Sequence, residues 1–176
     1  MSQAEFDAYV DEYEAQHAQS VRLSGEDPDF FAEYKAKEAA RVMAAAGVRP
    51  RRMMDFGAGR GNCVAHLQAA FPDAALTALD VSSRSLTHCA ARAIRLLETV
   101  CYDGETLPFE DARFDLVFTA CVFHHIPEDD HIRLLSEIRR TLTPEGRFVL
   151  FEHNPWNPLT RHAVATCPFD ANAVLI

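Results

Sequence analysis

The chain has 176 residues, with 17 Lys or Arg against 26 Asp or Glu, so its formal net charge is −9 at pH 7. This acidic balance disfavours a nucleic-acid partner, because binding to phosphates rests on cationic side chains. The five cysteines are odd in number and include no C-x-x-C pair, which argues against a disulfide framework or a zinc site. The length suits one domain, and the longest apolar run, Val117 to Phe123, is too short to span a bilayer. We therefore expect a soluble, cytoplasmic protein.

Two helices are predicted before the first strand. Residues 6–17 carry apolar side chains at helical spacing, which gives that helix an aromatic stripe. The second helix is expected to be capped by Asp29, to run to about Ala46 and to stop at Gly47. Packing of both helices against a sheet is the structural interpretation.

A strand, a tight turn and a helix are predicted over residues 53–71. The strand meets Asp55 and then three glycines spaced two apart, and the helix-like stretch runs from Asn62 to Phe71. The glycines are Gly57, Gly59 and Gly61. Glycine adopts the dihedral angles of such a turn and lets a ligand approach the backbone. A dinucleotide fingerprint would need a further glycine where Asn62 or Val64 stands, which disfavours an NAD(P)-dependent oxidoreductase.

A second strand is expected from Ala75 to Leu79, and it closes with Asp80. In a parallel sheet, an acidic side chain at this place can accept both hydroxyls of a ribose. The structural alternative is that Asp80 caps the next helix, although Ser82 or Ser83 could do so instead. The apolar face expected for that helix comprises Leu86, Cys89, Ala90, Ala93, Ile94 and Leu97. A short third strand is predicted over residues 99–102.

The fourth strand is expected to begin near Leu116 and to end in T-A-C-V-F-H-H-I-P, residues 119–127. His124 and His125, as neighbours in an extended segment, would point to opposite sides, and no third ligand is spaced near them, so we predict no metal site. Pro127 suits the start of a helix. The apolar face of this helix is expected to comprise Leu135, Ile138 and Leu142.

A type I turn over residues 143–146 is predicted to deliver a fifth strand over residues 147–151. The polar and aromatic loop of residues 152–161 follows it. In open α/β sheets, ligands bind outside the carboxyl ends of the strands, so this loop is the best candidate for substrate contacts. The alternative is that Glu152 and His153 only cap the strand or pair with each other.

Three motifs, in this order, resemble those of class I S-adenosylmethionine-dependent methyltransferases of the small-molecule branch, the type 11-like group. They are D-x-G-x-G-x-G at residues 55–61, Asp80 after the second strand, and D-G…L-P-F…F-D at residues 103–115. The ending F-H-H-I-P is similar to the L-H-H pattern of that branch. The resemblance covers roughly residues 30–155 and implies a Rossmann-like α/β fold, a doubly wound, mostly parallel sheet in three αβα layers. The family has seven strands in the order 3-2-1-4-5-7-6.

About five strands are found here, and the last two are missing. This predicts a C-terminal truncation, or a fifth strand covered by another element or subunit. An uncovered edge that carries Phe148 and Leu150 would favour a homodimer or aggregation. The family often uses N-terminal helices as a lid, so residues 1–47 are expected to form a cap or lid and residues 48–176 the methyltransferase domain. The side chains that such a lid could offer are Tyr9, Tyr13, Phe30, Phe31 and Tyr34.

The resemblance implies S-adenosylmethionine as cofactor. Asp103 would accept a hydrogen bond from the exocyclic amine of adenine, Gly104 would offer its N–H, and Ala120 with Cys121 would line the methionine part. The residues expected to bind the cofactor are Asp55, Gly57, Ala58, Gly59, Gly61, Asp80, Val81, Asp103, Gly104, Ala120 and Cys121.

The implied reaction is in-line transfer of the sulfonium methyl group to a small-molecule acceptor, which the aromatic segments suggest is lipid-like or glycan-linked. The cofactor carries the activation, so the chemistry requires no catalytic base. If a base is used, the candidates by position are His124, His153, Glu152 and, next to them, His125. A non-catalytic methyltransferase-like binding module is the alternative that the missing strands favour, and the oxidoreductase is the second alternative.

Overall fold

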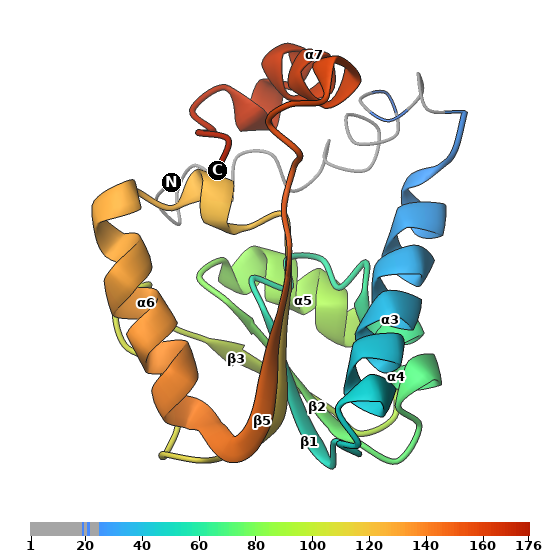
Figure 1. Ribbon diagram of the computed structural model, residues 1–176, viewed down its shortest axis with the longest axis vertical. Helices are drawn as coiled ribbons and strands as arrows, with labels where there is room; N and C mark the ends of the chain where they lie inside the picture. Colours follow the sequence, from blue (N-terminus) through green and yellow to red (C-terminus); the bar gives the residue numbers. More distant parts are fainter. Residues whose placement is uncertain (1–18, 20, 22–24) are drawn as a thin grey trace.

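The computed structural model describes residues 19, 21 and 25–176, without the side chain of Phe169. The helix predicted over residues 6–17, with Tyr9 and Tyr13, lies outside this part of the chain. The elements, labelled as in Figure 1, are α3 (Pro28–Ala45), β1 (Arg52–Phe56), α4 (Val64–Ala70), β2 (Ala75–Asp80), α5 (Ser83–Ala91), β3 (Leu97–Cys101), β4 (Phe114–Ala120), η2 (Phe123–His125), α6 (Glu128–Thr141), β5 (Leu142–Phe151), α7 (Pro158–Thr166) and η3 (Pro168–Asp170).

The strands form one sheet in the order β3-β2-β1-β4-β5, and all four pairings are parallel. The predicted parallel α/β sheet and its strand order are therefore confirmed for these five strands. Strand β1 lies in the middle, where Asp55 is in register with Ala78 of β2 and Phe118 of β4. All five strands consequently point their carboxyl ends to the same edge of the sheet.

Helices cover both faces of the sheet and give the three predicted layers (Figure 1). Consecutive side chains of a strand point to opposite faces, so Met53 packs in one core and Met54 in the other. The first core lies under α3, α4 and α5 and includes Met43, Met53, Leu67, Leu76, Leu86 and Phe118. The second lies under α6 and includes Met54, Phe56, Phe114, Val117, Leu134 and Ile138. No helix of the described chain is long and apolar enough to cross a membrane.

Helix α3 begins two residues earlier than the sequence predicts. The carboxylate of Asp27 accepts the N–H of Phe30 at 2.8 Å, and Pro28 occupies the first helical position. Asp29, the predicted cap, instead lies 2.8 Å from Nε2 of His66 on α4. The cap prediction was wrong because two acidic residues flank Pro28, and the fixed dihedral of proline favours the first position of a helix.

Helix α5 ends at Ala91, before the predicted apolar face is complete. Ala93 and Leu96 have positive φ angles of 52° and 60°, which no helix accommodates. The carbonyl of Leu96 accepts the N–H of Leu76 at 3.0 Å, and Leu97 already belongs to β3. Pairing with β2 therefore competes successfully for residues that helical periodicity assigned to α5.

Two further boundaries differ from the predictions. Strand β4 stops at Ala120, and the segment after it is a 3₁₀ helix, η2, rather than extended chain. Helix α6 passes directly into β5 at Leu142, so Leu142 is not on its apolar face and the separate turn at residues 143–146 is wrong. Phe114 pairs with Leu142 and Leu116 with Arg147, so residues 143–146 bulge opposite a single residue of β4.

Candidate active site

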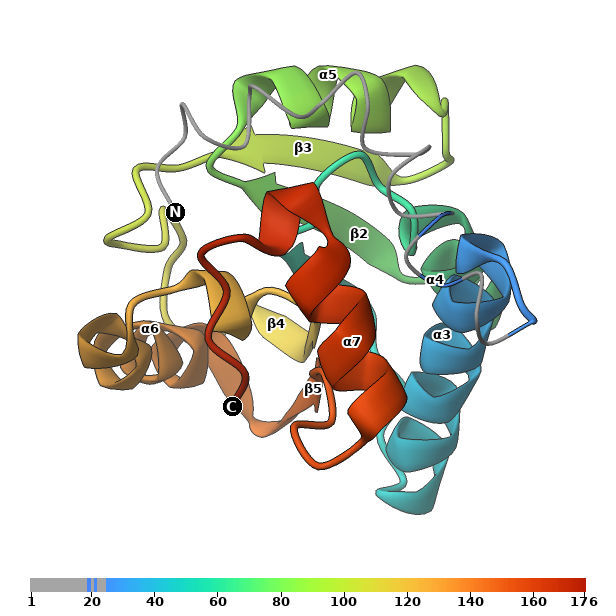
Figure 2. The same cartoon turned by 90° about the horizontal axis from the view of Figure 1, so that it is seen from above.

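A cavity of about 970 Å³ lies at the carboxyl ends of the strands. It is bounded by the glycine turn, by the chain that follows β2, β3, β4 and β5, and by one side of α3. Helix α7 and η3, residues 158–170, lie across these strand ends, and we call them the C-terminal cover (Figures 1 and 2). The predicted convergence of the motifs on one crevice is what the structure shows.

The glycine turn after β1 is held against β2. The N–H groups of Gly57 and Ala58 both donate to the carbonyl of Leu79, at 2.8 and 3.0 Å. Gly57 has a φ of 74°, and a Cβ on it would lie 2.5 Å from Val122 Cγ2. Gly57 is therefore required both by its backbone conformation and by the side chain packed over it.

The other two glycines of the turn differ in their surroundings. Gly61 does not line the cavity but faces α5. A Cβ on Gly61 would lie 2.6 Å from the sulfur of Cys89 on that helix. Gly59 does line it, has a φ of 53°, and has no atom within 4 Å of the place of a Cβ. Gly61 thus brings the turn close to α5, whereas Gly59 leaves space beside the cavity.

Asp80 closes β2, is 9% exposed and lines the cavity. One carboxylate oxygen accepts the N–H of Gly59 and the other the N–H of Ser82, both at 2.8 Å. The hydroxyl of Ser82 accepts the N–H of Ser85 and caps α5, so the structural alternative for Asp80, capping this helix with its own side chain, is not needed. Asp80 therefore ties the glycine turn to β2 at the wall of the cavity.

Asp55 is 3% exposed and lines the floor of the same cavity. Burial and, second to it, the charge of the Asp80 carboxylate raise the pKa of this carboxyl to about 7, against the opposing charge of Lys35. A carboxyl with this pKa gains its negative charge near neutral pH, and a cation bound beside it would favour the charged form.

The segment after β3 brings Asp103 and Gly104 to the cavity, as the sequence predicts. Asp103 is exposed, and one of its oxygens accepts the N–H groups of Glu105 and Thr106 at 2.8 and 3.0 Å. These hydrogen bonds hold the pKa of Asp103 below its usual value. Arg133 of α6 donates to the carbonyls of Gly104 and Glu105 and fixes the loop from the other side.

Lys35 was missed in the sequence analysis. The residues of α3 that line the cavity are Pro28, Phe31, Ala32 and Lys35. Their spacing of i, i+3, i+4 and i+7 is one face of a helix, and this was the available signal. Lys35 Nζ lies 3.4 Å from the sulfur of Cys121, a residue that leaves β4 with a φ of 59°. Burial lowers the pKa of Lys35, but Cys121 and Cys63 outweigh it, so the ammonium stays charged.

Helix α3 both packs against the sheet and forms part of the cavity wall. Its inner face, with Ala36, Ala39 and Met43, is buried in the first core. Of the aromatic side chains predicted for a lid, Phe31 lines the cavity, whereas Phe30 and Tyr34 are 46% and 52% exposed. The packing interpretation therefore holds for the inner face of α3, and the lid role of residues 1–47 stays a prediction.

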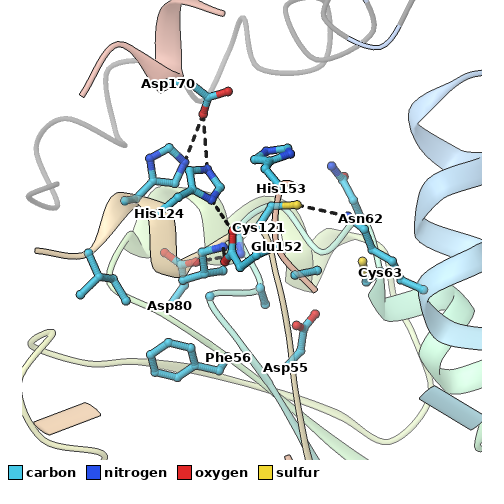
Figure 3. Close-up of a pocket in the computed structure, with 18 of the residues that line it drawn as sticks. Asp55, Phe56, Asn62, Cys63, Asp80, Cys121, His124, Glu152, His153 and Asp170 are labelled. Atoms are coloured by element: carbon cyan, nitrogen blue, oxygen red, sulfur yellow. Dashed lines mark hydrogen bonds and ion pairs between the residues drawn. The ribbon is translucent and has the colours of Figure 1, made fainter. Parts of the chain in front are cut away.

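A buried network of four side chains, those of Glu152, His124, His125 and Asp170, joins the end of β5, η2 and the C-terminal cover (Figure 3). One oxygen of Glu152 accepts the N–H groups of Val122 and Phe123 at 2.8 and 2.7 Å, and the other is 2.6 Å from His124 Nδ1. Asp170 of the C-terminal cover lies on the other side, with its Oδ1 3.6 Å from His124 Nε2 and 3.4 Å from His125 Nε2. Asp170 was also missed, because it is separated from the histidines by β5 and α7.

The two histidines do not point to opposite sides, and that prediction was wrong. They lie on the single turn of η2, their ring centroids are 4.0 Å apart, and both rings face Asp170. The reason is that Cys121 turns the chain out of the extended conformation before His124 is reached. The geometric argument against a metal site therefore fails.

The three catalytic candidates differ in what they can do. Burial lowers the pKa of His124, but Asp170 and Glu152 outweigh it and raise the pKa to about 9. Burial raises the pKa of Glu152, but the hydrogen bond and charge of His124 outweigh it and lower the pKa. Burial and the charge of His124 both lower the pKa of His153, which lines the cavity as a neutral imidazole. His153 is the member of this set that can accept a proton.

The loop after β5 contributes to the cavity only in part. Glu152, His153, Asn154 and Asn157 line it, and Leu159 and Thr160 of α7 follow. Trp156 is 87% exposed and does not line the cavity. The predicted aromatic substrate contact from this loop is therefore not formed in the structure.

Residues 54–150, more than half of the chain, match the model of a methyltransferase domain family. The fatty-acid O-methyltransferase of Mycolicibacterium smegmatis is 31% identical over 144 residues, which cover 81% of this chain and 51% of the relative. The malonyl-[acyl-carrier protein] O-methyltransferase of Geobacter sulfurreducens is 33% identical over 128 residues, which cover 69% of this chain and 47% of the relative.

Among solved structures, a SAM-dependent methyltransferase from Aquifex aeolicus superposes with a TM-score of 0.61 at 18% identity, over 80% of this chain and 76% of that one. This similarity supports the fold. The chain belongs to the methyltransferase domain family and has the fold of the class I S-adenosylmethionine-dependent methyltransferases. It spans about half the length of the relatives it matches. The family and fold confirm the resemblance and leave no support for the oxidoreductase.

Proposed function

We propose that the chain transfers the methyl group of S-adenosylmethionine to an oxygen of a small organic acceptor, namely a carboxylate attached to an apolar body. The observation that carries the proposal is that the glycine turn, Asp80 and the apolar side of the C-terminal cover face one cavity. The cavity has room for a nucleoside-sized cofactor and an acceptor together, since small-molecule sites typically measure about 300–1,000 Å³.

The residues present fit the cofactor. The open space beside Gly59 lets a ligand approach the backbone where any side chain would project into the cavity. Asp80 would accept the ribose hydroxyls, and Asp103 with Gly104 would meet the adenine ring. Asp55, Ala58 and Val81 would complete this side of the site, with Gly57 and Gly61 supporting the turn.

The methionine part would lie toward β4, beside Ala120 and Cys121. Two ionisable groups line the cavity there, the Asp55 carboxyl and the Lys35 ammonium, and an ammonium bound beside Asp55 would favour its ionised form. An amino acid carries an ammonium and a carboxylate, so the pair is complementary to it. Lys35 can equally meet the carboxylate of an acceptor, and the experiment below separates the two sources.

The apolar side chains around the rest of the cavity support an acceptor with a hydrocarbon body. They come from α3, from the segment after η2, from the middle of α6 and from the cover, and they include Phe31, Ile126, Leu134, Leu159, Ala163 and Val164. The names of the two relatives designate O-methylation of a fatty acid and of a malonyl group. Both are compatible with a carboxylate oxygen as the nucleophile.

The chain's own contribution would be alignment. The cofactor supplies an activated methyl group on a sulfonium, and holding two reactants in line can remove about 7–11 kcal/mol of the barrier. A carboxylate is ionised at neutral pH and has no proton to lose. His153, together with His124 and Glu152, would then orient the acceptor and shield it from water without acting as a base.

The test is transfer of a labelled methyl group to a panel of acceptors: fatty acids, a malonyl thioester, a short dicarboxylic acid, a quinol and a sugar. We expect label in the fatty acids or the malonyl thioester, as a methyl ester that alkali releases. Label only in the quinol or the sugar would contradict the acceptor class. Cofactor binding without turnover on any acceptor would favour the non-catalytic binding module.

Two variants of α3, Lys35→Met and Lys37→Met, test which carboxylate Lys35 binds, that of S-adenosylmethionine or that of the acceptor. Lys37 is 68% exposed and pairs with Glu33, so its variant is the matched control. A weaker Kd for S-adenosylmethionine in Lys35→Met places Lys35 at the methionine part. An unchanged Kd with a raised KM for the acceptor places it at the acceptor.

A further inference from the structure

We propose that His124, His125 and Asp170 bind one divalent transition-metal ion, with Zn²⁺ the expected ion, at the junction between η2 and the C-terminal cover. The proposal concerns ligand geometry and does not rest on methyl transfer. The donor atoms of the three residues all lie within 4.8 Å of one another. Figure 3 shows the Asp170 carboxylate facing the imidazole ring of His124.

The distances suit two ligands of a common ion better than hydrogen bonds. Asp170 Oδ1 is 3.6 Å from His124 Nε2 and 3.4 Å from His125 Nε2, whereas N–H···O bonds measure about 2.7–3.2 Å. Donors bound to zinc at about 2.0–2.1 Å and about 110–120° apart lie roughly 3.3–3.6 Å from each other. Two of the three donor pairs are therefore spaced as the ligands of a tetrahedral ion are, and the third pair lies within 4.8 Å.

Two of the donor atoms are buried and lack a hydrogen-bond partner within the described part of the chain. They are His124 Nε2 and Asp170 Oδ1, on side chains that are 1% and 6% exposed. An unsatisfied polar atom at such depth is costly, and buried polar atoms are almost always paired. A cation between the two atoms would satisfy both.

Glu152 orients the first ligand. Its carboxylate is 2.6 Å from His124 Nδ1, and it is fixed by the N–H groups of Val122 and Phe123. Donation of Nδ1–H to Glu152 leaves the lone pair of Nε2 directed toward Asp170. Metal-bound histidines characteristically donate their second nitrogen to a carboxylate in this way.

The donor set selects the kind of ion. Two imidazoles and one carboxylate suit zinc, whereas calcium and magnesium prefer oxygen ligands alone. Three protein ligands leave a fourth position, and all three residues line the cavity. A water molecule or an oxygen of a bound molecule would complete the tetrahedron.

Metal binding would fasten the C-terminal cover. Asp170 lies in η3, and the N–H of Val174, just beyond it, donates to the carbonyl of His124 at 2.8 Å. The two contacts already bring this end of the chain to η2. A bound ion would add a strong link between the cover and the sheet, across the mouth of the cavity.

The test is titration of tag-free, chelator-treated protein with Co²⁺, followed by competition with Zn²⁺. We expect one ion per chain by elemental analysis, the intense visible absorption of tetrahedral cobalt, and a rise in Tm on adding Zn²⁺. Asp170→Asn keeps the shape of the side chain and should weaken Zn²⁺ binding at least about tenfold, as should His125→Ala. His162→Ala, on the exposed side of α7, is the matched control and should bind as the parent does.

Circular dichroism of the metal-free variants establishes that they are folded, and Asp170→Asn serves alone if His125→Ala is not. The proposal is overturned if folded protein binds no stoichiometric metal, since His124 would then be an imidazolium shared by Glu152 and Asp170. A sulfur-to-cobalt charge-transfer band would overturn it as well, because it would place the ion at cysteine. Equal weakening in His162→Ala would have the same meaning.

Discussion

Replacing Asp55 by Asn removes a carboxyl group whose ionisation the fold opposes. The side chain is 3% exposed. Its pKa is raised mainly by burial and secondly by the charge of the Asp80 carboxylate. Between about pH 4 and pH 7 the unfolded chain has lost the Asp55 proton while the folded chain still holds it. The stability contributed at this position is therefore present at low pH and is lost as the pH rises through that window.

The magnitude follows from the two pKa values. The pKa rises from an ordinary value of 3.8 to about 7, a difference of about 3, and each step of one corresponds to about 1.36 kcal/mol, so the full effect is on the order of 4 kcal/mol. Asparagine has the same shape and no proton to lose. Relative to the parent, Asp55→Asn should gain stability as the pH increases from 4 to 7 and should change little above that.

The assay is urea unfolding of both proteins at a series of pH values, read as the difference in free energy of unfolding. Using the difference cancels the carboxylates that lie far from Asp55, because these titrate alike in the two proteins. Asp73→Asn, the same replacement at an exposed position after α4, is the matched control. A difference that is independent of pH, or that favours the parent increasingly at high pH, would refute the reasoning about burial.

Three further predictions follow from the contacts. Gly57→Ala should lose about 2–5 kcal/mol of stability, because alanine would have to adopt a left-handed backbone conformation and its Cβ would lie 2.5 Å from Val122. Gly59→Ala should lose only about 1–2 kcal/mol of stability but should bind S-adenosylmethionine more weakly. Thermal melts measure the first effect and calorimetry the second, and equal stability losses in the two variants would contradict the different roles given to these glycines. His153→Ala should lower kcat less than tenfold with a carboxylate acceptor, because a general base contributes about 10²–10⁴-fold; a loss in that range would make His153 the base. Leu150 is 40% exposed on the edge strand β5, so we expect the parent protein to self-associate in sedimentation experiments. Leu150→Lys should weaken this association about 10-fold or more, since burying a leucine contributes about 1.5–3 kcal/mol. A parent protein that is monomeric at micromolar concentration would exclude the dimer.

The glycine turn and Asp80 could be located from the sequence because their geometry is local. A strand, a turn and a helix within 30 residues fix where Gly57 and Asp80 stand relative to each other. The hydrogen bond that the Gly59 N–H donates to the Asp80 carboxylate completes the arrangement. The strand order depended on the resemblance, since periodicity alone does not say which strands are neighbours. These parts of the site follow from short stretches of chain.

Lys35 and Asp170 could not be located in the same way. Each reaches the cavity only because an element distant in the chain, α3 or the C-terminal cover, packs across the strand ends. The histidines were misplaced for a different reason: one positive φ at Cys121 converts an extended run into η2. Hydrophobic periodicity cannot reveal a change in one backbone dihedral angle at a residue such as cysteine, which is common in strands.

The measurement that tests the central claim most directly is calorimetric titration of the purified chain with S-adenosylmethionine and S-adenosylhomocysteine, beside Asp80→Asn and the Asp73→Asn control. We predict micromolar binding of both ligands by the parent and the control. Asp80→Asn should bind roughly 10–100-fold more weakly, because hydrogen bonds to a charged group contribute about 1.5–3 kcal/mol. Folded protein that binds neither ligand, or an Asp80→Asn variant that binds as tightly as the parent, would contradict the account.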